Sequence, residues 1–181
     1  MVEQVLSGDR ECFRELVERY QGRVYAITLR LVGNPTEAED LTQHSFIEAF
    51  RGLGSYDSQR SFATWLVCIA INNAKDFLKS HKRREQQLAG EVEGATALFC
   101  GRVPAPDQAL TDRERSALVS AALSRLHPKY RIPLVLKDVD GLSYNEMQQA
   151  LDLPLTTLKI RVVRARCQLQ EQLKPWLTNR S

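Results

Sequence analysis

The sequence predicts an all-α protein of two small helical domains joined by a flexible linker. Apolar residues recur at helical spacing through nearly every segment, and no stretch alternates convincingly as a strand. Residues 89–112 interrupt this pattern with three glycines and two prolines, which is typical of a linker. Residues 142–166 form two short helical patterns around a tight break, as in a helix-turn-helix. We therefore expect domains at 1–88 and 113–181.

Composition excludes several classes of protein. The hydrophobic content of 43% and charged content of 26% over 181 residues are ordinary for a soluble globular chain. A net charge of only +3 means that affinity for DNA has to come from local clusters. No apolar run reaches 18 residues, and no basic start precedes an apolar one. We expect a cytoplasmic protein that is neither exported nor membrane-spanning.

The four cysteines are scattered and have neither metal-ligand spacing nor a nearby histidine pair. They predict reduced thiols, no metal site and no cofactor. An enzyme would need Cys68 or Cys167 as nucleophile, with His44, His81 or His127 as base. Nucleophile-elbow and phosphate-loop motifs are missing from the sequence, so we place the enzyme hypothesis last.

Three helices are expected in the first domain. The first spans about Cys12–Val32 and ends at the Gly33-Asn34-Pro35 break. The second begins near Thr36, a natural N-cap, and breaks at residues 52–55. The third runs from about Phe62 to His81.

The third helix carries a polar stripe that is separate from its apolar face. The stripe consists of Asn72, Lys75, Asp76, Lys79 and Arg83. Cations near a helix C-terminus also complement the helix dipole, so the stripe alone is an even choice between solvated surface and nucleic-acid contact. Asparagine favours the second reading, because its amide can pair with a base edge. The preceding loop, residues 56–62, is polar with an aromatic residue at each end, which suits capture of an extruded base.

The linker holds four acidic residues and one basic residue, a net charge of −3. Its 24 residues reach about 80 Å when extended, at roughly 3.3 Å each. Two turns of B-DNA cover roughly 70 Å. One chain can therefore contact two DNA elements at once, and the tether raises the effective concentration of the second contact.

The second domain begins with helices at about Arg113–Leu126 and Pro128–Val139, followed by the helix-turn-helix. Ser143 and Glu146 form a capping box for its first helix. Asp152 suits a left-handed turn, and Pro154 prevents the helix from continuing. Thr156 or Thr157 is the expected N-cap of the second helix.

One narrow face of this second helix is apolar and therefore buried; it comprises Leu158, Val162, Ala165, Leu169 and Leu173. Ile160 and Arg164 point away from that face, with Lys159 and Arg161 on its flanks. A basic outer face is usually only solvated surface. An apolar Ile160 at its centre instead favours contact with a thymine methyl group, while the cations hold phosphates or guanine edges.

Taken together, these motifs resemble an extracytoplasmic-function sigma factor of the sigma-70 family. Residues 38–50 resemble the family's polymerase-binding helix, and residues 61–78 resemble its −10-reading segment. Leu126-His127-Pro128, residues 141–144 and Lys159-Ile160-Arg161 resemble its −35-reading domain. Each motif is weak alone, but three in the family's order over nearly the whole chain are specific.

The resemblance implies roles for named residues. Docking on the clamp coiled coil of core RNA polymerase would use Asp40, Gln43, Phe46, Ile47, Phe50 and Leu53. Contact with the melted −10 element of promoter DNA would use Arg60, Ser61, Phe62, Asn72, Asn73, Lys75, Lys79 and Arg83. Reading of the −35 element would use Thr157, Lys159, Ile160, Arg161 and Arg164. The resemblance also implies an anti-sigma factor, often membrane-anchored, which would hold the chain at the inner membrane face, and no small-molecule substrate.

The chain departs from the family pattern at several positions. The family usually has a small polar residue at Ile160, glycine at Thr156 and Asp152, and alanine at Gln148. The promoter sequence therefore cannot be copied from relatives. The N-terminus begins a few residues late, so we expect an incomplete first helix. The alternative function is a stand-alone helix-turn-helix regulator with an N-terminal partner or sensor domain.

Overall fold

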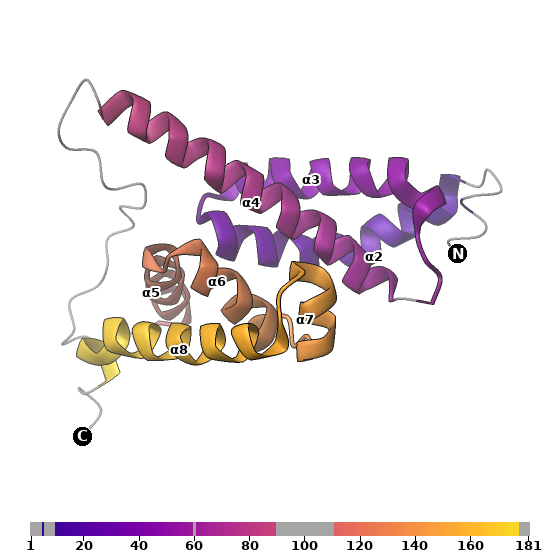
Figure 1. Cartoon of the computed structure of the whole chain (residues 1–181). Helices are drawn as coiled ribbons and strands as arrows, with labels where there is room; N and C mark the ends of the chain where they lie inside the picture. The colour runs from indigo at the N-terminus through magenta and orange to yellow at the C-terminus, as the bar shows by residue number, and fades with distance from the viewer. Residues whose placement is uncertain (1–4, 6–9, 60, 90–110, 178–181) are drawn as a thin grey trace.

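The computed structural model describes residues 5, 10–59, 61–89 and 111–177, and these residues are helical with no strand. The predicted all-α fold is confirmed. Figure 1 shows the helices stacked in two layers, with the N-terminal half on one side and the C-terminal half on the other. Nearly all of the predicted linker, residues 90–110, lies outside the described residues.

The N-terminal half consists of α2 (Arg10–Val32), α3 (Pro35–Gly52), the short 3-10 helix η1 (Leu53–Ser55) and α4 (Phe62–Ala89). The predicted N-cap of α3 was wrong by two residues. Asn34, not Thr36, caps it, and the Asn34 side chain accepts the backbone N–H groups of Thr36 and Glu37 at 2.9 and 3.3 Å. Pro35 then occupies the first helical position, where its missing N–H costs nothing.

The C-terminal half consists of α5 (Asp112–Arg125), α6 (Pro128–Leu134), η2 (Val135–Val139), α7 (Tyr144–Leu151) and α8 (Leu155–Leu177). The single α-helix expected from Pro128 to Val139 is instead an α-helix followed by a π-helix. Pro133 has no N–H to donate within α6, which disturbs the regular ladder just before the wider turn. The π-helix closes with the Asp140 N–H on the Val135 carbonyl oxygen at 3.0 Å.

The two halves share a hydrophobic core in this structure. One cluster is confined to the N-terminal half and includes Leu16, Val24 and Leu66. The other joins residues of both halves. Its N-terminal members include Ile27, Leu31, Val67, Ile71 and Ala74, and its C-terminal members include Leu123, Leu136, Met147, Leu158 and Val162. Neither the length of the linker nor the helical periodicity of the sequence predicts that the two halves pack together.

Candidate protein and nucleic-acid interfaces

Four of the six residues expected to bind polymerase form an exposed stripe on α3. Asp40, Gln43, Ile47 and Phe50 fall within about 80° of the helix circumference at 100° per residue. Ile47 is 48% exposed and Phe50 is 45% exposed, which is unusual for such large apolar side chains. Two polar positions followed by two apolar ones therefore present a docking surface along the outer face of α3.

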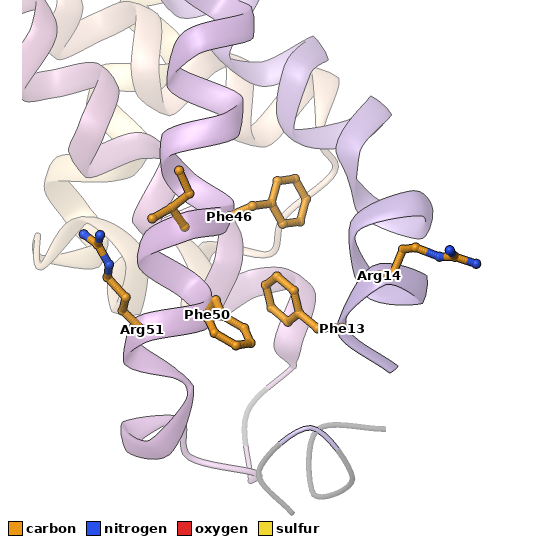
Figure 2. Close-up of a pocket in the computed structure, with 6 residues that line it drawn as sticks. Phe13, Arg14, Phe46, Phe50 and Arg51 are labelled. Carbon is orange, nitrogen blue, oxygen red and sulfur yellow. The ribbon is translucent and has the colours of Figure 1, made fainter. Parts of the chain in front are cut away.

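The apolar end of this stripe faces a groove of about 520 Å³ between α2 and α3. Figure 2 shows the Phe13 ring of α2 turned toward Phe50, with the Arg14 and Arg51 side chains extending away on either side. The Phe13 and Phe50 ring centroids lie 4.9 Å apart in an edge-to-face arrangement. The groove thus combines an apolar floor with cations at its rim, which suits an apolar partner edged with acidic residues.

Phe46 and Leu53 do not belong to the exposed stripe. Phe46 is 6% exposed and Leu53 is 2% exposed, and both pack in the core of the N-terminal half. Phe46 lines the floor of the groove, whereas Leu53 lies in η1 beneath it. These two residues would therefore support a docking surface on α3 from the core, and their role in docking stays a prediction. Phe13 and Arg14 also line the groove, and the sequence alone did not single them out.

The polar stripe on α4 is present, and Asn72, Lys79 and Arg83 are exposed along it. Lys75 is half-buried; burial lowers its pKa, and its Nζ donates to Asn72 Oδ1 at 3.4 Å. Lys79 and Arg83 line a shallow hollow with Asp76, Ser80 and Arg84 near the end of α4. This end of the helix projects beyond α3 in Figure 1, so its cations are open to a polyanion.

Two residues assigned to the same surface have other contacts. Phe62 is 8% exposed, and its ring lies among Tyr20, Tyr56 and Trp65 at centroid distances of 5.6 to 5.7 Å. It fixes the start of α4 and has no open face for stacking on a base. Asn73 is half-buried and donates from Nδ2 to Ser45 Oγ of α3 at 3.2 Å. Ser61 is exposed, and Arg60 lies outside the described residues.

The helix-turn-helix forms as predicted in three respects. Ser143 and Glu146 make both bonds of the capping box, with Ser143 N–H on Glu146 Oε2 at 2.8 Å and Glu146 N–H on Ser143 Oγ at 3.2 Å. Asp152 ends α7 in the left-handed conformation at φ 49°. Leu158, Val162 and Ala165 are 0% exposed. The predicted N-cap at Thr156 or Thr157 was wrong, because α8 already begins at Leu155 and places both in its first turn.

The outer face of α8 carries two exposed apolar side chains rather than one. Ile160 is 53% exposed and Val163 is 56% exposed, and three residues of separation place them side by side. Lys159 and Arg164 are exposed near them, while Arg161 and Thr157 are only half-exposed. Sequence reasoning missed Val163, although a second apolar residue outside the buried 158–162–165 face was a readable signal.

Two arginines of α8 contact other elements of the C-terminal half. A side-chain hydrogen bond with Arg164 lowers the pKa of Tyr130 of α6, so the two side chains are neighbours. Arg166 pairs with Asp138 of η2 through two of its three side-chain nitrogens, Nε and Nη2, with Nε donating to Oδ2 at 2.8 Å. Arg164 thus lies beside Tyr130, whereas Arg166 already has a carboxylate partner.

No group of three or more histidine, cysteine or acidic side chains able to hold a metal occurs in the described part of the chain. Across the same residues, no helix is long and apolar enough to cross a membrane.

Known proteins share both halves of this architecture. Residues 16–84 match the family model for sigma-70 region 2, and residues 116–169 match that for sigma-70 region 4. The chain is 35% identical over 178 residues to the ECF RNA polymerase sigma factor SigW of Bacillus subtilis, covering 96% of this chain and 95% of that protein. It is 31% identical to the ECF RNA polymerase sigma-E factor of Haemophilus influenzae, covering 97% and 94%. The chain belongs to the extracytoplasmic-function sigma factors of the sigma-70 family.

Solved structures agree with that membership. CnrH in complex with the cytosolic domain of CnrY is similar with a TM-score of 0.68 at 26% identity, over 96% of this sigma factor and 94% of that chain. The sigma factor RpoE in complex with the anti-sigma factor NepR from Bartonella quintana gives 0.72 at 24% identity, over 91% and 98%. The second likeness is one of fold.

Proposed function

We propose that this sigma factor directs promoter-specific initiation of transcription and makes no chemical change itself. It binds core RNA polymerase, reads two promoter elements and holds the melted strand. The observation that carries the proposal is the combination of three surfaces in one chain. The exposed stripe on α3, the polar stripe on α4 and the helix-turn-helix occur in the order of the two sigma-70 regions that the chain matches.

Polymerase docking is assigned to Asp40, Gln43, Ile47 and Phe50, with Phe46 and Leu53 supporting them from the core. The large exposed apolar area of Ile47 and Phe50 supports this assignment. Burying it against a partner is favourable at about 25 cal/mol per Å². Arg14 and Arg51 at the groove rim favour a partner surface edged with carboxylates.

Promoter contact is divided between the halves. On α4, Asn72 hydrogen-bonds an unpaired −10 base, while Lys79 and Arg83 hold the backbone of the displaced strand. Strand capture offsets unstacking costs of a few kcal/mol. On α8, Ile160 and Val163 meet thymine methyl groups in the major groove, flanked by Lys159 and Arg164.

Regulation by an anti-sigma factor is part of the proposal, because RpoE of Bartonella quintana was solved bound to one. Polymerase and promoter DNA lie in the cytoplasm, so the chain acts there. A membrane-anchored inhibitor would hold it at the inner face of the membrane.

The test is transcription from a random promoter library with purified core polymerase, alone and with this chain. We expect the full chain to select a set of promoters with two shared motifs about two helical turns apart, identified by sequencing transcript starts. If the chain binds duplex DNA tightly by itself and adds no initiation to core polymerase, the proposal fails. A stand-alone regulator is then the better description.

A further inference from the structure

A chain of hydrogen bonds runs from α4 into the backbone of α3. Asn73 follows Asn72 by one residue, about 100° around α4, so that Asn72 is exposed and Asn73 is half-buried. The Asn73 Nδ2 atom donates to Ser45 Oγ of α3 at 3.2 Å. The Ser45 hydroxyl in turn donates to the Leu41 carbonyl oxygen at 2.6 Å. One of the two neighbouring asparagines is therefore turned toward α3.

Small side chains surround this bond. Ser45 is 0% exposed. Ala49, one turn after it on α3, and Ala70, one turn before Asn73 on α4, are also 0% exposed and belong to the core of the N-terminal half. Alanine side chains interlock little, whereas a hydrogen bond is directional. The Asn73–Ser45 bond is thus well suited to set how far α4 is rotated against α3.

Other polar contacts of these helices lead to different elements. Thr42, one turn before Ser45, is 8% exposed, and its Oγ1 lies 3.1 Å from Thr28 Oγ1 of α2. Thr64 of α4 donates from Oγ1 to Glu146 Oε1 of α7 at 3.2 Å. The first contact joins α3 to α2 and the second joins α4 to α7. Neither joins α3 to α4, as the Asn73–Ser45 bond does.

The bond lies between the two binding surfaces proposed for this half. The exposed stripe on α3, which includes Ile47 and Phe50, lies about 140–220° around the helix from Ser45 and so faces away from α4. A polymerase bound to that stripe holds α3, and the packing of α4 on α3 then decides where Asn72 points. A rotation of α4 by about 20° moves a side chain at a radius of roughly 6 Å by roughly 2 Å, which breaks a hydrogen bond to a base.

We infer that Asn73 is a positioning residue for the −10 reader: through Ser45 it sets the rotation of α4 on the polymerase-bound α3 and so aims Asn72 at the melted strand. The family resemblance implies that Asn73 contacts DNA directly. Its half-buried amide and its bond to Ser45 favour an indirect role instead. The inference rests on the proposed function, because only a chain that holds a melted strand needs Asn72 aimed.

The test is a double-mutant cycle of Ser45→Ala and Asn73→Ala in the full chain bound to core polymerase. Fluorescence anisotropy measures affinity for a promoter fork in which the −10 motif from the promoter library is single-stranded on the non-template strand. Each single variant should bind about fivefold to thirtyfold more weakly than wild type. The double variant should bind no more weakly than the weaker single, since both substitutions remove the same bond. Affinity for core polymerase without DNA should stay at the wild-type value, because Ser45 is buried on the side of α3 opposite the exposed stripe.

Two further variants separate positioning from a general loss of stability. With Asn72→Ala present, Asn73→Ala should have little additional effect on fork affinity, because the residue that it aims is gone. Thr42→Ala is the matched control, since it removes a buried hydroxyl from the same helix but one that contacts α2. Its fork affinity should stay within about twofold of wild type, while thermal melts followed by circular dichroism show that Thr42→Ala and Ser45→Ala lose comparable stability.

Each remaining outcome counts against the inference. If Asn73→Ala loses as much affinity with Ser45→Ala or Asn72→Ala present as it does alone, Asn73 reads the DNA itself. An equal loss in Thr42→Ala means that loosening of the half explains the defect, and wild-type affinity in both single variants means that the bond does not set the rotation. Wild-type holoenzyme that binds the fork no better than core polymerase alone refutes the proposed function, and the inference with it.

Discussion

The N-terminal half packs one group of apolar side chains only against itself, whereas the core of the C-terminal half runs into the N-terminal half. Leu16, Val24 and Leu66 belong to the first group. Met147 and Leu158 share their cluster with Ile71 across the interface. If the halves separated, the effect on each would differ. The N-terminal half would keep a core of its own, whereas the core of the C-terminal half would lose the N-terminal side chains that now cover part of it.

The sharpest test of this contrast compares Ile71→Ala with Leu66→Ala. Both residues lie on α4 and are 0% exposed, but Ile71 is in the shared core and Leu66 is in the core of the N-terminal half. Each truncation should cost about 2–5 kcal/mol of unfolding free energy locally. Only Ile71→Ala should also speed hydrogen exchange in α6 and α8. Mass spectrometry of the exchanged peptides measures this, and matching exchange profiles for the two variants would erase the distinction between the cores.

A substitution on the surface of the N-terminal half should change polymerase binding without changing the shared core. Phe50→Ala removes an exposed ring above a groove that is lined only by α2 and α3. If Phe50 is a docking hot spot, affinity for core polymerase falls by about 2 kcal/mol, roughly thirtyfold, in a fluorescence or interferometry titration. Exchange in the C-terminal half should not change.

Val119→Ala is the control for that titration. Val119 is also an exposed apolar residue, at 39%, but it lies on α5 in the other half. It should bind polymerase as wild type does. A loss as large as that of Phe50→Ala would mean that exposed apolar area in general, and not the α3 stripe, governs binding.

Sequence reasoning succeeded where the cause is local. The Ser143–Glu146 capping box, the left-handed Asp152 and the buried face of Leu158 and Val162 each depend on residues within a few positions of one another. Their hydrogen bonds and helical period are set by neighbours, so pattern and propensity suffice.

Sequence reasoning failed where a residue's surroundings depend on segments that are distant in the chain. Phe62 follows a polar segment that looks open in the sequence, but it begins α4, and Tyr20 and Trp65 enclose its ring. Arg23 and Asp140, 117 positions apart, have no periodic signal that pairs them. Such contacts depend on how finished helices pack, which one sequence without related sequences does not specify.

The proposed DNA-reading face of the C-terminal half, on α8, allows a test in that half alone. Arg164→Ala should weaken binding to −35 DNA by about 1–3 kcal/mol if the guanidinium contacts a base. Tyr130→Phe keeps Arg164 and removes only the neighbouring hydroxyl, so its loss should be smaller. Electrophoretic mobility shifts on polymerase-bound promoter fragments compare the two. A larger loss for Tyr130→Phe would show that the tyrosine itself reads the DNA.

Acidification should have the smallest effect on stability and on the contact between the halves. Comparing the two capping boxes distinguishes these two effects. Hydrogen bonds from the Ser143 side chain and backbone hold the pKa of Glu146 below its ordinary value, with smaller contributions from Thr64 and Arg23. Thr111 lowers the pKa of Glu114 on α5 in the same way, without a contact to the other half among the causes. A carboxylate with a lowered folded pKa stabilises the fold above its ordinary pKa of about 4.5, and that stability is lost as the pH falls below it.

Glutamine at either position can keep its cap but no longer titrates. We therefore expect Glu146→Gln to flatten both the fall in stability between pH 6 and about pH 3 and the accompanying rise in radius of gyration. Glu114→Gln should flatten only the stability curve, because its carboxylate starts α5 and does not hold the halves together. Urea unfolding and small-angle X-ray scattering across the same pH series measure the two slopes. Equal effects of both substitutions on the radius of gyration would show that the pH response does not depend on the Thr64–Glu146 contact.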